Sequence, residues 1–169
     1  MNVSNAIYPL NVIADAFRRA GLSESVLIGT MAAAVHGASV LTEDFDYFVP
    51  PYRDLSQRIQ RAADLLGAIV YKPKRHGGTT MLFVKATNLQ VDLLVQASGI
   101  RSYRSIRTRA KLHPGLSDTL VASLTDVIRS KRAAGRPKDL AILPELEETL
   151  HEIERQKKRA STSSRSHRR

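Results

Sequence analysis

The sequence has 169 residues, 43% of them hydrophobic, and its 26 Lys and Arg against 16 Asp and Glu give a formal net charge of +10. This length fits one domain with an ordinary core, and the lack of cysteine excludes disulfides, thiolate metal sites and a cysteine nucleophile. No apolar run is long enough to cross a bilayer and the first residues do not resemble a signal peptide, so we expect a cytoplasmic protein that does not enter a membrane.

The first part of the chain predicts a helix, a strand and a second helix. Apolar residues at helical spacing predict a helix over residues 10–20, which ends at Gly21. The apolar run 26–28 predicts the first core strand, and Gly29 follows it, where the lack of a Cβ lets the backbone approach a ligand closely. A helix over residues 31–35 would present N–H groups to a phosphate at its start. The alternative is that Gly29 only turns the chain.

Two aspartates lie two positions apart at the next predicted strand, residues 45–49. Side chains alternate along a strand, so Asp44 and Asp46 point to one face while Phe45 points to the core. Neighbouring carboxylates repel each other unless a cation lies between them. Such oxygen ligands suit Mg²⁺, which proteins commonly hold with one or two carboxylates and substrate phosphates.

A third aspartate lies alone in an apolar strand. The expected elements of this region are a helix over residues 55–66, strands over 68–71, 81–84 and 89–95, and a basic, Gly-rich hairpin loop over 72–79. Asp92 belongs to the last of these strands, and burying it is unfavourable unless it is paired or bound to a metal. If this strand adjoins that of Asp44 and Asp46, three carboxylates converge on a site for one or two Mg²⁺ ions.

The C-terminal part predicts three more helices, over residues 101–110, 124–134 and 144–156. Lys131, Arg136 and Lys138 either contact a triphosphate or an acidic partner, or form a solvated basic helix face. We expect Asp139 to pair with one of them. Thr42 either contacts phosphate or is an ordinary β-branched residue at the start of a strand.

The basic charge is concentrated at the end of the chain. Residues 155–169 hold seven basic residues and no acid, which accounts for seven of the ten net charges. Their Ser, Thr and Arg content cannot build a core, so we expect a folded domain over residues 1–154 and a disordered basic tail over 155–169. This tail is either a solvated end or an electrostatic arm that makes weak contacts to nucleic acid.

Several motifs occur together in an order that resembles a known superfamily. They are Gly29-Thr30, His36-Gly37, Asp44-x-Asp46, Asp92 and the stretch from Lys131 through Arg136-Pro137-Lys138-Asp139. The chain resembles the nucleotidyltransferase superfamily with a DNA polymerase β-type core, over about residues 10–150. The resemblance is strongest to the small bacterial branch of minimal nucleotidyltransferases and their toxin–antitoxin-associated relatives. It implies an α+β fold in which helices pack on a mixed β-sheet and a helical segment closes the C-terminal side.

The resemblance also implies an activity and a set of site residues. The activity is Mg²⁺-dependent transfer of a nucleotidyl group from a nucleoside triphosphate such as ATP to an acceptor hydroxyl. Asp44, Asp46 and Asp92 would be the catalytic residues and would hold two Mg²⁺ ions. The nucleotide-binding residues would be Gly29, Thr30, Thr42 and Lys131. The acceptor stays open between a partner protein, an RNA end and a small molecule.

Three positions depart from the pattern of these relatives. Thr30 stands where Gly or Ser is usual, Val40 where Arg is frequent, and Ile142 where an acid often follows Arg-Pro-Lys-Asp-Leu-Ala. The loss of the Arg supports a second hypothesis, a non-catalytic antitoxin-like or regulatory partner that retains the fold.

Overall fold

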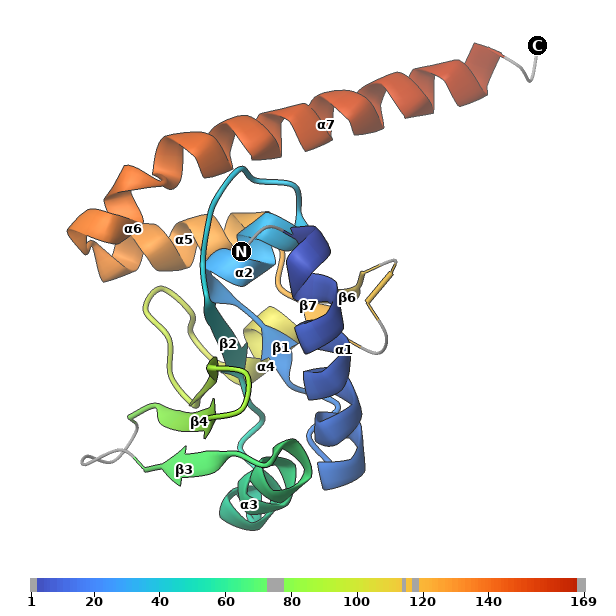
Figure 1. Ribbon diagram of the computed structural model, residues 1–169. Helices are drawn as coiled ribbons and strands as arrows, with labels where there is room; N and C mark the ends of the chain where they lie inside the picture. Colours follow the sequence, from blue (N-terminus) through green and yellow to red (C-terminus); the bar gives the residue numbers. More distant parts are fainter. Residues whose placement is uncertain (1–2, 73–77, 114, 117–118, 167–169) are drawn as a thin grey trace.

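A single mixed sheet forms the centre of the molecule (Figure 1). The computed structural model describes residues 3–72, 78–113, 115–116 and 119–166, and within these ranges the sheet has seven strands in the order β3-β4-β5-β2-β1-β7-β6. The strands are β1 Val26–Leu27, β2 Asp44–Phe48, β3 Ile69–Tyr71, β4 Thr80–Val84, β5 Leu89–Leu94, β6 Lys111–Leu112 and β7 Leu120–Val121. The helices are α1 Val3–Ala20, α2 Gly29–Val35, α3 Leu55–Leu66, α4 Tyr103–Arg107, α5 Leu124–Ala134, α6 Pro137–Ala141 and α7 Leu143–Ser166.

The strand directions confirm the predicted α+β class with a mixed sheet. Strand β2 runs parallel to β5, and β1 runs parallel to β7. The pairs β1–β2, β3–β4, β4–β5 and β6–β7 are antiparallel. The parallel pair β2–β5 matters most for function, because it joins two strands that are far apart in the sequence.

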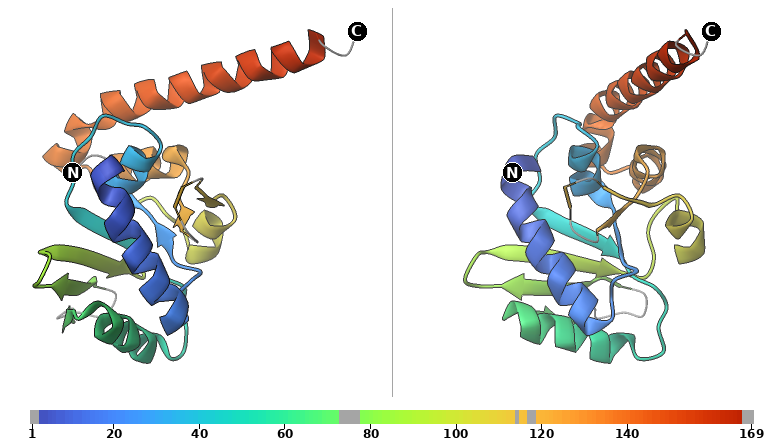
Figure 2. Two further views of the ribbon diagram at one scale, coloured as in Figure 1. Left: turned by 45° about the vertical axis from the view of Figure 1, so that its right-hand side comes forward. Right: turned by 90° about the vertical axis from the view of Figure 1, so that its right-hand side faces the viewer.

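Helices α1 and α3 pack against each other and cover one face of the sheet (Figure 2). Helix α1 buries Leu10, Ile13, Phe17 and Ala20, whose spacing of three and four residues places them on one side of the helix. The ring of Phe17 meets that of Tyr47 on β2 edge-to-face, with 4.9 Å between the ring centroids. This face of the sheet is therefore part of the hydrophobic core.

Most predicted elements are confirmed, and the differences concern short or terminal segments. The predicted helices over 55–66 and 124–134 coincide with α3 and α5, whereas α1 begins earlier than predicted and includes Pro9. Helix α4 is shorter than predicted: it starts after Ser102, which caps it by accepting a hydrogen bond from Ser105 N, and it ends at Arg107. The two-residue strands β6 and β7 were not predicted, since strands this short have no alternation pattern. Most of the predicted hairpin loop, residues 73–77, lies outside the described residues.

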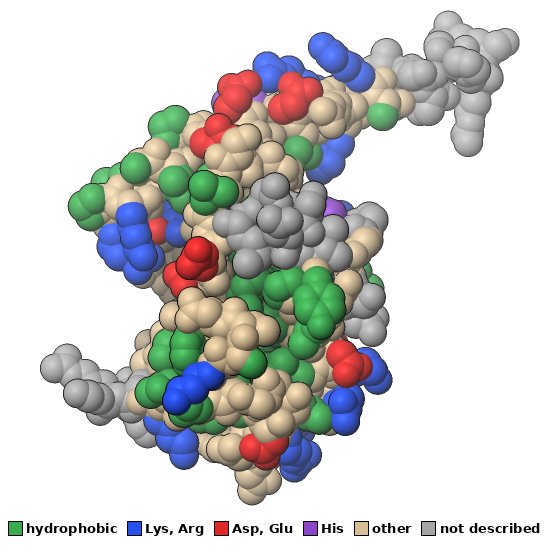
Figure 3. Space-filling model, viewed as in Figure 1, with side chains coloured by type: hydrophobic (Ala, Val, Ile, Leu, Met, Phe, Trp, Pro, Cys, Tyr) green, Lys and Arg blue, Asp and Glu red, His purple; other side chains and the backbone are tan. Residues whose placement is uncertain are grey.

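Helix α7 extends past the rest of the molecule (Figure 1). Acidic side chains occur along its middle, and Lys and Arg side chains lie further toward its free end (Figure 3). The structure has residues 155–166 as helix where a disordered tail was expected, while the division of the chain at residue 154 stays a prediction. Among the described residues, no helix is long and apolar enough to span a bilayer.

Deleting residues 157–169 is expected to leave the unfolding temperature unchanged, because the described side chains of residues 157–160 are exposed and surface charges contribute little. Deleting residues 150–169 instead is the matched control, since it also removes Leu150 and Ile153, which pack against the core. We expect this longer deletion to lower the unfolding temperature by about 4–8 °C. Thermal unfolding followed by circular dichroism measures the unfolding temperature of both deletions. Equal losses would contradict the conclusion that α7 packs on the core through Leu150 and Ile153 and is exposed beyond them.

Candidate active site at the junction of β2 and β5

The acidic residues of β2 and β5 lie side by side on one face of the sheet. The register of these parallel strands pairs Asp46 with Asp92, and Asp44 with Gln90. Laterally paired residues point to the same face, so the three carboxylates are neighbours although one of them comes from a distant part of the sequence. Phe45 points the other way and is fully buried. The predicted adjacency of the two strands is confirmed.

The negative charge of Asp46 is disfavoured where it lies. Burial is the main reason that the pKa of Asp46 is raised from 3.8 to about 6, and the carboxylates of Asp92 and Asp44 add to it. Lys131 and Arg136 act in the opposite direction, which places these two cations near the carboxylates. A further cation bound here would therefore be stabilised electrostatically.

Asp92 has a polar neighbour that sequence reasoning missed. Burial raises the pKa of Asp92, and Gln90 Nε2 partly opposes this shift by donating a hydrogen bond of 3.2 Å to Asp92 Oδ2. The signal in the sequence was the spacing of two residues, which places both side chains on the same face of a strand.

Gly29 lies against the carboxylate of Asp46. Its φ of +70° is in the left-handed region, and a Cβ added here would collide with Asp46 Oδ2. The amide of Ile28 also donates a hydrogen bond of 2.8 Å to the carbonyl of Asp46. The backbone at Gly29 therefore does approach another group closely, as expected, but that group is the carboxylate of Asp46.

A cleft of about 350 Å³ opens in front of these residues. Its lining includes Asp46, Asp92 and Gly29 together with the cations Lys131 and Arg136. Its remaining polar lining residues are Thr79, Gln96, Ser98 and Ser130. The cleft therefore brings carboxylates and cations to one cavity, as a site for a metal-bound polyphosphate requires.

Asp139 holds the two cations of this cleft. It is fully buried and accepts a hydrogen bond of 2.7 Å from Lys131 Nζ and another from Arg136 Nε. Burial by itself would raise the pKa of Asp139, but the hydrogen bonds from Arg136 and Lys131 outweigh it and hold the pKa below its ordinary value. The predicted pairing of Asp139 with a neighbouring cation is confirmed, and it involves two cations.

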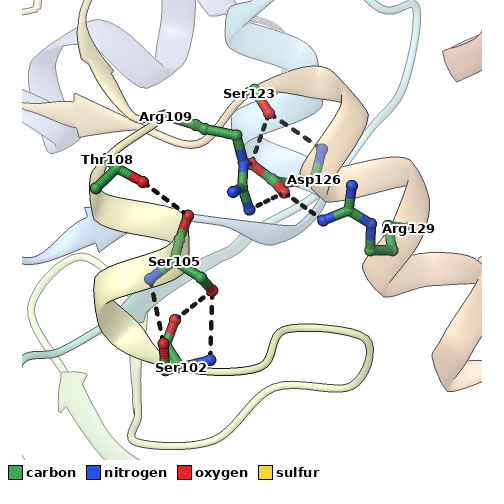
Figure 4. A network of polar contacts seen from close by, with 7 residues as sticks. All are labelled: Ser102, Ser105, Thr108, Arg109, Ser123, Asp126 and Arg129. Atoms are coloured by element: carbon green, nitrogen blue, oxygen red, sulfur yellow. Dashed lines mark hydrogen bonds and ion pairs between the residues drawn. The ribbon is translucent and has the colours of Figure 1, made fainter.

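A second buried carboxylate anchors the start of α5 (Figure 4). Asp126 accepts hydrogen bonds from Arg109 Nε at 2.9 Å and Nη2 at 2.7 Å, and from Arg129 Nη1 at 3.0 Å. Ser123 Oγ donates to Asp126 at 2.7 Å and accepts from its backbone amide at 3.2 Å, which caps the helix. This network ties α5, which carries Lys131, to the segment after α4. The spacing Ser123-x-x-Asp126 was its only signal in the sequence.

The remaining predicted residues have local roles or lie beside the cleft. Thr42 Oγ1 accepts a hydrogen bond of 3.2 Å from the amide of Asp44, and Thr30 is the second residue of α2. Val40, where relatives often have Arg, is buried in the core. An Arg side chain at this position would lie in an apolar site, and the cations that act on Asp46 in this chain are Lys131 and Arg136.

The three carboxylates do not form a closed metal cage as they stand. Within the part of the chain that the structure describes, no three His, Asp or Glu side chains are grouped so that they could hold a metal ion. The donor set still suits Mg²⁺, because Asp44, Asp46 and Asp92 offer only carboxylate oxygens on one face. Asp44 is exposed at the start of β2, whereas Asp46 is partly buried.

Comparison with solved structures identifies a similar fold. The solution structure of the antibiotic-resistance factor ANT(2'')-Ia superposes with a TM-score of 0.61 at 13% sequence identity, covering 97% of this chain and 96% of that one. Two Helicobacter pylori proteins are less similar and carry no part of the argument. JHP933 has a TM-score of 0.41 at 18% identity over 69% of this chain and 53% of its own. The other, a proposed nucleotidyltransferase, has a TM-score of 0.39 at 18% identity, and the match covers 72% of this chain and 57% of that one.

The likeness to ANT(2'')-Ia, at this low identity, shows the fold alone. It confirms the predicted arrangement, in which helices pack on a mixed sheet and a helical segment follows it. No family model matches the sequence, and no curated protein matches it significantly.

Replacing Gly29 with Ala is expected to destabilise the fold and to displace the Asp46 carboxylate. Gly37→Ala is the matched control, because Gly37 also has a positive φ, of +98°, but a Cβ added there meets nothing within 4 Å. The backbone conformation alone should cost on the order of 1–2 kcal/mol in each variant. Gly29→Ala should lose clearly more stability in urea unfolding than Gly37→Ala, and equal losses would show that Asp46 does not occupy the space above Gly29.

The pKa of Asp139 predicts how stability depends on pH. A carboxyl whose pKa is lower in the folded state stabilises the protein above its unfolded pKa of 3.8, and this stabilisation is lost as the pH falls toward the folded value. Asp139→Asn should lose about 1.5–3 kcal/mol near neutral pH and show a smaller further loss below pH 4. Urea unfolding of both proteins across this range measures the difference, and parallel pH profiles would contradict the ion-pair assignment.

Proposed function

We propose that this chain is a Mg²⁺-dependent nucleotidyltransferase that transfers a nucleotidyl group from a nucleoside triphosphate to an acceptor hydroxyl. The observation that carries the proposal is the in-register pairing of Asp46 with Asp92, which puts carboxylates from two distant segments at one cleft opposite Lys131 and Arg136. Carboxylates that are half-buried beside each other are unfavourable unless a cation joins them. A bound metal–triphosphate would resolve this repulsion.

The residues divide into a metal side and a phosphate side. Asp44, Asp46 and Asp92 would hold Mg²⁺, which when bound neutralises the triphosphate and polarises the phosphorus that is attacked. Lys131 and Arg136 would bind the phosphate oxygens that face away from the metal. Gly29 and Thr30 would let the chain approach the same phosphates, and Thr42 supports the start of β2. Two metal ions, and ATP as the nucleotide, stay predictions.

The reaction proceeds by displacement at the α-phosphorus of the bound triphosphate. The acceptor hydroxyl oxygen forms a bond to this phosphorus while the bond to the oxygen bridging to the β-phosphate breaks. Pyrophosphate leaves with that bonding pair, and the hydroxyl proton passes to the carboxylate of Asp92, which lies on the side of Asp46 away from Gly29. Catalysis by positioning and charge neutralisation is sufficient for phosphoryl transfer, so no histidine base is required.

Two observations bear on the alternative of a non-catalytic partner module. The three carboxylates are not preassembled as a cage, which favours the alternative. The cations Lys131 and Arg136 are held in front of Asp46 by Asp139, which favours catalysis, since a module that had lost its chemistry would have no use for this arrangement. The toxin–antitoxin association, the cytoplasmic location and the acceptor stay predictions.

Replacing Asp46 or Asp92 with Asn is expected to weaken Mg²⁺-dependent binding of ATP at least tenfold, because each variant removes one carboxylate ligand. Asp64→Asn is the control, since Asp64 lies exposed on α3, where it accepts a hydrogen bond from Gln60. Without Mg²⁺, Asp46→Asn should unfold at a higher temperature than the native protein, because the repulsion from Asp92 and Asp44 is relieved.

Isothermal titration calorimetry with ATP, with and without Mg²⁺, measures the binding. Native affinity in both cleft variants would overturn the metal site. If the native protein binds Mg²⁺–ATP but transfers no labelled nucleotide to any component of a cell extract, the non-catalytic module becomes the better explanation.

A further inference from the structure

The face of the sheet that carries the carboxylates continues across β4 and β3. The antiparallel register pairs Asp92 of β5 with Met81 of β4, and Met81 with Tyr71 of β3. Laterally paired side chains share a face, so one row runs across four strands from Asp46 through Asp92 and Met81 to Tyr71. Neighbouring strands lie about 4.8 Å apart, which puts Met81 one such step from Asp92.

A second row lies beside the first. It runs from Asp44 through Gln90 and Phe83 to Ile69. Each row therefore begins with an acidic residue on β2 and ends with apolar or aromatic residues at the edge of the sheet. We call the four outer residues, Ile69, Tyr71, Met81 and Phe83, the sheet platform.

The sheet platform is open to solvent. Ile69 is 42% and Tyr71 47% exposed, and Met81 and Phe83 are half-buried. The residues that alternate with them, Val70 and Leu82, belong to the core on the face that α1 and α3 cover. An apolar surface of this kind next to a charged cleft indicates a binding surface.

The strand order assigns the two sides of the carboxylates to different substrates. Gly29 follows β1, which adjoins β2 on the side opposite to β5. Helix α2, which begins at Gly29, contacts α5, which carries Lys131. The cations required by a triphosphate are therefore at the β2 side of the site. The sheet platform lies on the other side, beyond Asp92, and carries no charge, so it suits the acceptor.

The chemistry of the sheet platform suits a nucleobase. Tyr71 and Phe83 offer aromatic faces on which unpaired bases stack, and Met81 offers a polarisable thioether beside them. Lys72, which follows Tyr71 directly, is exposed and offers a cation to a phosphate backbone. Thr79, Gln96 and Ser98 line the cleft near Asp92 and supply the hydrogen-bonding partners that a ribose 2′-hydroxyl requires.

We propose that the sheet platform binds the unpaired base at the 3′ end of a single-stranded RNA and so brings the terminal hydroxyl to Asp92. This inference rests on the proposed nucleotidyl transfer, because it identifies the acceptor of that reaction. It goes further in assigning a binding role to four residues on the open face of β3 and β4.

The test compares Tyr71→Ala with Tyr71→Phe and with Tyr8→Ala. Tyr8 is a matched control, an exposed tyrosine on α1, the helix that covers the opposite face of the sheet (Figure 2). Affinity for a 5′-labelled pool of short random RNAs is measured by fluorescence anisotropy, beside a DNA pool of the same lengths. We expect Tyr71→Ala to weaken RNA binding about 5- to 100-fold, as loss of one stacked base predicts. Tyr71→Phe and Tyr8→Ala should bind RNA as the native protein does.

Affinity for Mg²⁺–ATP, measured on the same variants, separates this inference from the proposed function. Unchanged ATP binding together with lost RNA binding in Tyr71→Ala supports the sheet platform. Native RNA affinity in Tyr71→Ala, or equal loss in Tyr8→Ala, overturns it, while ATP binding would still support the nucleotidyltransferase. DNA bound as tightly as RNA, or labelled nucleotide transferred to protein and not to RNA, overturns the RNA acceptor.

Discussion

The pairing of β2 with β5 is the constraint on which the rest of this structure depends. It puts Asp46 beside Asp92, and Asp44 two residues earlier on the same face of β2. The like charges of Asp46 and Asp92 are partly buried there. Placing them there is unfavourable by itself, since both burial and mutual repulsion disfavour the ionised forms. The charge of the carboxylates then explains two side chains that are not part of the core, Lys131 on α5 and Arg136 just before α6, both of which lower the pKa of Asp46.

These cations are positioned by residues that do not line the cleft. Asp139 is fully buried and binds both Lys131 and Arg136, so each cation has a fixed direction before any ligand arrives. Asp126, in turn, fixes the first turn of α5 through Arg109 and Arg129. A buried carboxylate with two cationic partners can hold a helix in place more firmly than apolar packing alone, because its hydrogen bonds are directional. The positions of Lys131 and Arg136 in the cleft therefore depend on the ion pairs of Asp139 and Asp126.

The two faces of the sheet have different functions. The face that α1 and α3 cover is part of the hydrophobic core, and the other face carries the candidate site. Alternate residues such as Phe45, Leu82 and Val91 are buried under α1 and α3 and stabilise the fold. The residues between them meet either the cleft or solvent. A single strand such as β2 therefore serves the core and the site at once, and a shift of one residue in its register would exchange the two faces.

The sequence by itself determined the elements and the chemical types at the site. Alternation around Phe45 predicted that Asp44 and Asp46 share a face, and the lone acid in an apolar run singled out Asp92, because both signals lie within a few neighbouring residues. The sequence pattern could not decide which strands adjoin, that Asp126 anchors α5, that Val40 is in the core, or that Tyr71 continues the row of Asp92. These facts depend on pairings between residues far apart in the chain, and only the tertiary structure decides them, since the energy that selects a register comes from packing of the whole sheet against its helices.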